Sequence, residues 1–417
     1  MTTIKTTNSA ARVSITEPGE SPFALHEIFY SRTDGRGVIR AGNALFRRVS
    51  GHDWPGLIGA PHKIIRHPDM PRAVFWLLWQ TIKSGQPVGA YVKNLARDGR
   101  HYWVFAVVLP LQDGYLSVRI KPSGPLFALI KAEYAALRSR EQAESLSPEA
   151  SANGLLARLT ELGFSGYGDF MARALAQELA ARDAASGGAC GDQLQLLHGV
   201  SQSLVAAAGE QTALTGVFES LQSVQTNIRI VAGRLEPAGG PISAIADNYK
   251  VASGEILTQL RAFAGEKGNL CDRMAQVVTD SVFLTGCALV QSELVQQYQR
   301  ETEPQGPNDV AAEMAALQRM EVECAVHARA GLTEAVRVAD DLARSSVSLK
   351  RVIMGLDAIR VMGKVECGRL MAGGTSLATT IDQLDRFHAD IRGRLDAIAA
   401  LSGQIRIGAA RFAGRAA

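Results

Sequence analysis

The apolar residues of this chain follow one pattern up to about residue 122 and a different pattern from about residue 125 onward. The first part holds short runs of apolar, β-branched and aromatic residues. Three of these runs are separated by "ARDGR" and "LQDG", which contain the Asp-Gly pair that favours tight hairpin turns. The second part is rich in Ala, Leu, Gln, Glu and Arg, with apolar residues at helical spacing. The sequence therefore predicts a small α+β domain followed by an all-α region.

Changes in composition divide the chain further. Residues 1–22 are polar, rich in Thr and Ser and without apolar periodicity, which indicates a flexible leader. We expect the α+β domain at residues 23–122 and connector helices at residues 123–189. The stretches "ASGGACGD" and "ETEPQGPND" then mark the breaks before two long helical regions, at residues 190–300 and 310–417.

The two helical regions resemble each other at a constant offset. The stretch "LQSVQTNIRIVAGRL" matches "LDAIRVMGKVECGRL" 135 residues later, and the same offset pairs Leu214 with Leu349 and Ile256 with Ile391. Each copy reads as a helix, a turn with two glycines ("EPAGGP" or "MAGGTS") and a returning helix. We therefore expect repeated long hairpins that form a helical bundle or a long stalk.

The composition argues against several classes of protein. The chain has 44 Lys and Arg against 41 Asp and Glu, and no concentrated basic run, which argues against nucleic-acid binding. Its five Cys lie far apart without a CxxC pair, which argues against disulfides and zinc and for a reducing compartment. We find no secretory signal and no long apolar run, so we expect a soluble cytoplasmic protein without a transmembrane segment.

The sequence shows no catalytic motif. It has no GxSxG stretch, no glycine loop followed by Lys-Ser or Lys-Thr, and no HExxH. Paired His or Cys at metal-ligand spacing are also missing from the sequence. We therefore expect that the protein is not an enzyme.

One stretch, "IIRHPDMPRAVFWLLWQ", gathers residue types that are scarce elsewhere in the chain. Arg66, His67 and Asp69 lie among prolines that stiffen the backbone, and Trp76 and Trp79 share one face of the predicted helix that follows. An Arg can hold a phosphate or a ring carbonyl, and a His can donate or accept near neutral pH. Such a mixture suits an aromatic ligand. The residues alone equally allow Trp79 to be a core anchor and Arg66 to pair with Asp69 on the surface.

The region around this stretch strongly resembles the flavin-binding PAS domain of bacterial aerotaxis receptors. The shared motifs are "RHPDMP", the helix end "WQTIKSGQP", "VKN", an Asp-Gly turn, "HYWV" and "GYLSVR", and they keep the order and spacing of the family. The resemblance covers about residues 23–122. It implies a five-stranded antiparallel PAS sheet with flanking helices that holds FAD. The flavin-contacting positions of the family correspond here to Asn43, Arg66, His67, Asp69 and Trp79.

Two alternatives to a flavin sensor stay open. The family usually has Trp where this chain has Val88, so the PAS domain could have lost its cofactor and serve only as a scaffold for dimerisation. A haem-loaded PAS domain is the other alternative, and it ranks lower. Its candidate axial ligands are His62, His67 and His101.

The helical region bears a weaker resemblance to the signalling tip of chemoreceptors. The stretch "QTNIRIVAGRLEPAGGPISAIADNYKVAS" keeps Gln225, Thr226 and Asn227 of that tip but has Ala232–Leu235 in place of the Glu-Ala-Ala-Arg element that docks the kinase. Together the two resemblances imply a homodimeric redox or oxygen sensor of the aerotaxis type. Its signal would pass through the predicted helix at residues 125–145 to a chemotaxis kinase or coupling protein.

Overall fold

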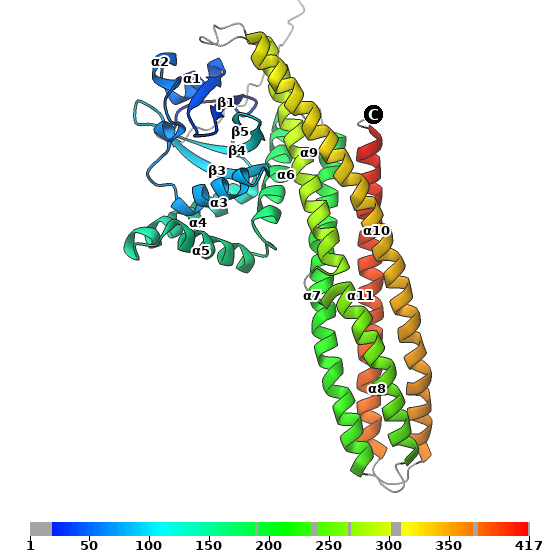
Figure 1. The fold of residues 1–417 in the computed structure, drawn as a ribbon. Coiled ribbons are helices and arrows are strands. Elements are labelled where there is room, and N and C mark those ends of the chain that lie inside the picture. Colours follow the sequence, from blue (N-terminus) through cyan, green and yellow to red (C-terminus); the bar gives the residue numbers. More distant parts are fainter. Residues whose placement is uncertain are drawn as a thin grey trace, which may run out of the picture. The chain divides into compact units, whose positions relative to one another are not determined.

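The computed structural model of the protein describes most of the chain (Figure 1). The described ranges are 19–187, 191–234, 240–265, 268–301, 310–369 and 374–415. Most of the predicted leader, the centre of the first predicted break and nearly all of the second lie outside these ranges.

The chain divides into two compact units, which we describe separately. The first is formed by Met1–Gly191 and Phe283–Cys324, and the second by Asp192–Val282 and Ala325–Ala417. Two long helices, α9 (Leu270–Arg300) and α10 (Val310–Arg369), contribute to both units. We name residues 283–301 and 310–324 the return segment, because the chain comes back to the first unit there.

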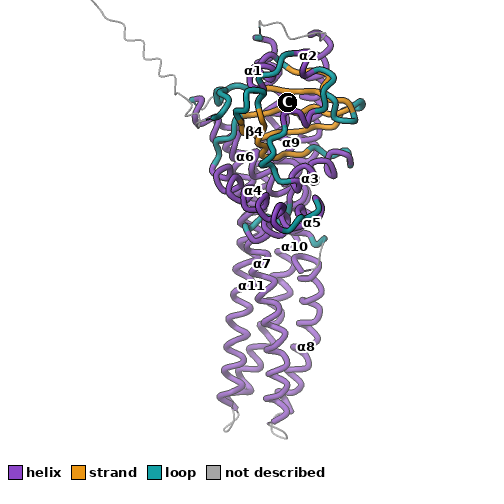
Figure 2. The backbone as a smooth tube through the Cα atoms, turned by 90° about the vertical axis from the view of Figure 1, so that its left-hand side faces the viewer, coloured by secondary structure: helices purple, strands orange, loops and turns teal. Residues whose placement is uncertain are grey.

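The first unit contains a five-stranded antiparallel sheet with the strand order β2-β1-β5-β4-β3. The strands are β1 (Ile28–Asp34), β2 (Ile39–Gly42), β3 (Val88–Leu95), β4 (His101–Leu111) and β5 (Gly114–Ile120). This sheet and its flanking helices confirm the PAS fold that the sequence predicts. Figure 2 shows the strands in orange gathered in this one part of the chain, with helices in purple elsewhere.

Both Asp-Gly pairs lie in hairpin turns, as predicted. The first pair connects β3 to β4, and Gly99 there has a positive φ of 88°. The second pair connects β4 to β5, where a Cβ on Gly114 would lie 1.9 Å from the carbonyl oxygen of Thr33. Glycine is therefore required at position 114, because any side chain would collide with the backbone of β1.

Among residues 19–187, seven helical segments accompany the sheet of the first unit. Four precede β3, namely α1 (Ala44–Ser50), α2 (Trp54–Leu57), the 3-10 helix η1 (His62–Ile65) and α3 (Arg72–Lys83). Three follow β5, namely α4 (Pro125–Ala143), α5 (Pro148–Glu161) and α6 (Tyr167–Ser186). The last three occupy the region for which the sequence predicts connector helices.

Helix α4 starts directly after the sheet and is fixed at its first turn. The carboxylate of Glu178 in α6 accepts hydrogen bonds from the backbone N–H of Ser123 at 2.5 Å and of Gly124 at 2.7 Å, and from the Tyr91 hydroxyl at 2.7 Å. Glu178 therefore holds the two residues just before α4 and ties them to β3. Ile130 and Tyr134 of α4 are buried, so this face of the helix packs on the core.

The sheet is buried on both faces. Strand β1 shows the alternation most clearly, since Ser31 and Thr33 point to one face and Tyr30 and Arg32 to the other. Tyr30 and Ser31 are fully buried at 0% exposure, Thr33 is buried, and Arg32 is half-buried. The return segment packs against the Tyr30 face, as described below.

Every element of secondary structure that the structure describes in the second unit is a helix. It contains α7 (Gly191–Arg234), α8 (Gly240–Leu260) with the π-helical turn Arg261–Gly265 after it, α11 (Gly374–Arg415), and parts of α9 and α10.

The helices of the second unit follow the repeat seen in the sequence. Helices α7 and α10 end at Arg234 and Arg369, at the same offset as the matching stretches. The aligned pairs are buried alike, with Leu214 and Leu349 at 0% and 2% exposure and Ile256 and Ile391 at 1% each. The turns predicted at "EPAGGP" and "MAGGTS" lie partly outside the described residues.

Within the described ranges, one helical stretch, Asp247–Arg300, is apolar enough to cross a membrane by length and composition alone. In the structure 61% of its most apolar window is buried inside the protein. Core helices of soluble proteins have the same character, so a single stretch of this kind is weak support for a membrane span.

Candidate functional site

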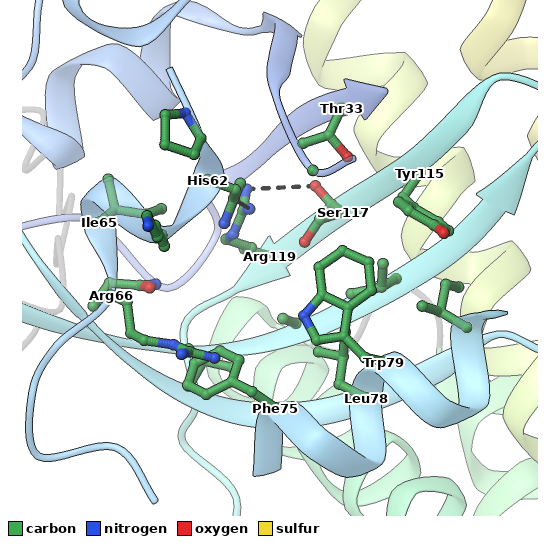
Figure 3. A pocket seen from close by; sticks show the side chains of 18 of the residues that line it. Thr33, His62, Ile65, Arg66, Phe75, Leu78, Trp79, Tyr115, Ser117 and Arg119 are labelled. Atoms are coloured by element: carbon green, nitrogen blue, oxygen red, sulfur yellow. Dashed lines mark hydrogen bonds between the residues drawn. The ribbon is translucent and has the colours of Figure 1, made fainter. Parts of the chain in front are cut away.

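A cavity of about 300 Å³ lies between the sheet and the segments η1 and α3 (Figure 3). Phe75, Trp79 and Tyr115 supply aromatic walls, while Val92 and Val108 belong to its sheet side. Cavities for small ligands start at about 300 Å³, so this one has room for a planar ring system and not for a whole dinucleotide. The rest of a larger ligand has to lie at its mouth.

Every charged side chain that lines the cavity is basic. These residues are Arg36, Lys63, Arg66 and Arg119, and the cavity lining within the described residues contains no carboxylate. Arg119 is buried, with 2% of its surface exposed, whereas the other three reach solvent. A cavity with this charge favours a ligand that presents anionic groups or carbonyl oxygens.

Arg119 and His62 form a close pair in the cavity wall. The Arg119 Nη2 lies 2.5 Å from Nε2 of His62 and donates to the Ser31 hydroxyl at 2.8 Å. Because an Arg side chain can only donate, Nε2 of His62 has to accept, which places the His62 proton on Nδ1. No carboxylate of the described residues pairs with Arg119. Instead, its guanidinium lies 5.2 Å from the ring centre of Phe46.

The pKa values of this pair are shifted in the directions that burial requires. Burial, with Arg119 and Arg66 as further causes, lowers the pKa of His62 to about 3. Burial also lowers the pKa of Arg119 to about 10. At neutral pH the pair therefore consists of a neutral imidazole and a cationic guanidinium, and the charge of the guanidinium is left for a ligand to neutralise.

Asn94 presents an unused donor to the cavity. This residue of β3 is 3% exposed, it lines the cavity, and its Nδ2 has no hydrogen-bond partner in the described structure. A buried amide without a partner costs about 1–3 kcal/mol. A ligand that brings an acceptor oxygen to Asn94 recovers this free energy, so the residue fits a ring that carries carbonyl groups.

Two residues that the resemblance assigns to the flavin line the cavity. The Arg66 guanidinium lies 3.2 Å from the ring centre of Phe75, and burial lowers the pKa of Arg66 to about 10. Trp79 makes an edge-to-face contact with Tyr115, with 5.4 Å between the ring centres. Both residues are placed where they can touch a bound ring.

His67 and Asp69 lie outside the cavity lining. Nδ1 of His67 accepts a hydrogen bond from the backbone N–H of Asp69 at 3.1 Å, and the exposed Asp69 carboxylate pairs with Nζ of Lys93 at 2.7 Å. The Lys93 ammonium holds the pKa of Asp69 below its usual value. Burial, followed by the charge of Lys93, lowers the pKa of His67. In this structure the two residues attach the loop that contains Arg66 to strand β3.

Asn43 and Val88 also lie outside the lining. Asn43 is fully buried and caps α1, because its Oδ1 accepts from the backbone N–H groups of Phe46 and Tyr30, each at 3.2 Å. Val88 is fully buried in β3 opposite Val108. Position 88 therefore belongs to the core at the end of the cavity and not to its wall.

The haem candidates are placed differently from one another. His62 lines the cavity, whereas His67 and His101 lie outside its lining and contact each other with 6.2 Å between ring centres. The only one of the three that faces the cavity is thus the one whose Nε2 already accepts from Arg119.

Sequence reasoning missed Arg119 and Asn94 as site residues. Both stand in short motifs that carry the resemblance, "GYLSVR" and "VKN", but neither was selected. The available signal was the alternation in β5, where Ser117 and Arg119 interrupt an apolar strand at every second position. Polar residues at such spacing lie on one face of the sheet.

The His62 geometry gives a first prediction. We expect His62 to remain neutral, with its proton on Nδ1, from pH 8 down to about pH 4. Nitrogen-edited NMR of the imidazole groups, assigned with His62→Gln, checks this. Because the folded pKa lies below the unfolded one, this residue's contribution to stability is complete above about pH 6.5 and is lost as the pH falls toward 3. Titration of His62 near its ordinary value of about 6.5 would show that the Arg119 hydrogen bond does not form.

Comparisons with known proteins agree with this fold. Residues 41–117 match the family model of the PAS fold. The aerotaxis receptor of Escherichia coli is 37% identical over 124 residues, which are 28% of this chain and 24% of the receptor. The nitrogen fixation regulatory protein of Klebsiella pneumoniae is 31% identical over 81 residues, which are 19% of this chain and 16% of that protein.

The chain was also compared with solved structures. The PAS domain of a protein from Colwellia psychrerythraea is 18% identical, and the match covers 22% of this chain and 85% of that one with a TM-score of 0.20. The matched curated relatives are longer proteins, of which this chain spans about a quarter or less. The family match and the sequence identity confirm that the chain contains a PAS domain similar to that of an aerotaxis receptor.

Proposed function

We propose that the protein is a sensor whose PAS domain binds FAD and passes the state of the flavin to its helical region. The observation that carries this proposal is the cavity itself, which has aromatic walls, only basic charges and an unused Asn94 donor. A flavin ring system is planar and aromatic, and it carries carbonyl oxygens. The match to an aerotaxis receptor supports the same reading.

The residues of this chain fit the parts of FAD as follows. Trp79 and Tyr115 would hold the ring system, and Asn94 and Arg119 would donate to its carbonyl oxygens. Arg36 and Lys63, which are exposed at the cavity, would meet the phosphates. When bound, the flavin supplies reversible electron transfer. The chain supplies binding, orientation and a positive charge beside the ring.

The two alternatives are less well supported by the same residues. A haem needs a His nitrogen that is free to ligate iron, and Nε2 of His62 accepts from Arg119 instead. A scaffold without a cofactor would leave the Asn94 donor buried and unused. Flavin binding accounts for both features.

The output of the sensor belongs to the same proposal. We infer a cytoplasmic homodimer whose helical region acts on a chemotaxis kinase or coupling protein. The support is the similarity of its PAS domain to an aerotaxis receptor and the tip-like residues Gln225, Thr226 and Asn227 in α7. The missing Glu-Ala-Ala-Arg element makes a coupling protein the first partner to test.

Direct titration tests flavin binding. The full-length protein, stripped of bound small molecules, is titrated with FAD, FMN and riboflavin while flavin and tryptophan fluorescence are recorded. All three ligands should enter the cavity with their ring, and FAD should bind most tightly because it adds contacts at Arg36 and Lys63. Failure of all three ligands to bind would refute the proposal.

Helix α4 offers a route for the signal, and its contacts make a second prediction. Nε of Arg138 donates to the carbonyl oxygen of Pro68 at 3.1 Å, and the buried Glu141 carboxylate accepts from the backbone N–H of Ala73 at 3.1 Å. Helix α4 therefore contacts the loop after Arg66 and the start of α3. We expect amide hydrogen exchange across Pro125–Ala143 to differ between the oxidised and reduced protein.

The control for this measurement is the protein without FAD under the same oxidising and reducing conditions. Its exchange gives the background difference between the two redox states. Identical protection across α4, with changes confined to the cavity, would show that the signal does not leave by this helix.

A further inference from the structure

We propose that Glu301, the residue that follows α9, is a positioning residue for the flavin cavity and couples the return segment to the bound ligand. This inference rests on the proposed function and adds a second connection between the PAS domain and the helices. All the contacts involved lie within the first unit.

Glu301 binds the start of α1 with both carboxylate oxygens. Its Oε1 accepts from Nδ2 of Asn43 at 2.7 Å, and its Oε2 accepts from the backbone N–H of Ala44 at 3.3 Å. A carboxylate at a helix N-terminus is favoured by the helix dipole and by the free N–H groups there. A side chain 258 residues downstream of Asn43 thus completes the cap of this short helix.

The capped helix leads to the cavity. The Oδ1 of Asn43 accepts from the backbone N–H of Phe46, and the Phe46 ring lies parallel to the His62 ring, with 6.5 Å between centres and 2° between planes. The Arg119 guanidinium lies over the same Phe46 ring. Phe46 therefore packs against both His62 and Arg119. A shift of the N-terminus of α1 would move Phe46 and with it this pair.

Strand β1 provides a parallel connection. On its cavity face, Ser31 accepts from Arg119. On its other face, the ring of Tyr30 packs edge-to-face on Tyr298 with 5.5 Å between centres, and Arg32 forms an ion pair with the buried Glu313. One strand thus touches the cavity's buried cation on one side and the return segment on the other.

These contacts have a reciprocal consequence. If contact with the return segment holds the cavity in its binding geometry, then weakening that contact lowers the affinity for the ligand. Bound ligand in turn favours the docked state of the segment, and the two equilibria change by the same factor. Because Gln keeps the shape and one acceptor oxygen of Glu301 while removing its charge, the pair of variants Glu301→Gln and Glu301→Ala separates geometry from charge.

The experiment measures FAD affinity, the absorption spectrum of bound FAD, and amide exchange in the full-length protein. We expect Glu301→Ala to weaken FAD binding by about five-fold or more and to alter the flavin spectrum, with Glu301→Gln in between. In the wild type, FAD should slow exchange at residues 310–324, and Glu301→Ala should abolish that effect.

The matched control is Glu323→Ala, an exposed position on the same segment. Its FAD affinity should stay within about two-fold of that of the wild type.

The outcomes are distinguishable from those of the functional proposal. If the wild type binds FAD and both Glu301 variants bind it with unchanged affinity and spectrum, the positioning role is refuted. If the wild type binds no FAD, the proposed function fails. The positioning role is then decided by exchange at residues 43–50 and 62–66 in the ligand-free protein, where Glu301→Ala should raise the rates and unchanged rates would refute it.

Discussion

Replacing Arg119 by Met should weaken FAD binding by one to two orders of magnitude while the domain stays folded. Arg119 is the buried cation of the cavity, and no carboxylate of the described residues neutralises it. Hydrogen bonds to a charged group contribute about 1.5–3 kcal/mol, which corresponds to roughly 10- to 150-fold in affinity. Met has a similar length and is apolar, so it can fill the same space without leaving a charge behind. Fluorescence titration with FAD measures the change.

The matched control is Arg100→Met, at an exposed residue of the β3–β4 turn that pairs only locally with Asp98. We expect this variant to bind FAD like the wild type. Since Arg119 is also a cause of the low pKa of His62, Arg119→Met should raise that pKa toward its ordinary value. An Arg119→Met protein that binds FAD with unchanged affinity would mean that the buried guanidinium does not face the ligand.

Replacing Phe283 by Ala should lower the stability of the PAS domain by about 3–5 kcal/mol, although Phe283 lies far downstream in the sequence. Phe283 is 2% exposed, and a Cβ on Gly89 of β3 would lie 2.9 Å from its ring. The return segment is therefore part of the core that covers the sheet. All four Trp of the chain lie between residues 54 and 103, so tryptophan fluorescence during urea unfolding reports on the PAS domain alone.

The control for this prediction is Phe263→Ala, at an equally buried Phe of the second unit. In this variant the urea concentration at the midpoint of unfolding, followed by tryptophan fluorescence, should equal that of the wild type. An unchanged midpoint in Phe283→Ala would show that residues 23–122 fold as a separate domain without the return segment.

The sheet of the PAS domain could be predicted because its signals are local. An Asp-Gly pair forms a hairpin turn through the backbone preferences of its own residues, and the strands that flank Gly99 and Gly114 pair as antiparallel neighbours. The helical repeat could be predicted for a similar reason, since a fixed offset repeats the same buried positions, such as Leu214 and Leu349. These features need no knowledge of distant contacts.

The candidate site could be predicted only in part. Arg66 and Trp79 line the cavity and could be selected because they stand close together in an unusual stretch. Asn94 and Arg119 reach the same cavity from separate strands, and only the strand order brings them beside η1 and α3. That a buried cation lacks a carboxylate partner is a property of the folded protein, so no sequence pattern could reveal it.

The role of the return segment could not be predicted from the sequence. Its pattern of apolar residues is that of any long helix. The residues that contact the PAS domain through polar groups include Gln297, Glu301 and Glu313, and in the sequence they resemble ordinary solvent-exposed polar residues. In the structure Gln297 donates to and accepts from the backbone of Ile28 at the start of β1. Such contacts join segments far apart in the chain, and propensity and periodicity carry no information about them.

The central claim is that this PAS domain holds FAD, and the visible absorption spectrum of the purified full-length protein tests it most directly. The account predicts the two absorption bands of an oxidised flavin, loss of the longer-wavelength band on chemical reduction, and release of FAD at about one per chain on heat denaturation. A Soret band, or a colourless protein that takes up no FAD when the cofactor is added, would contradict it.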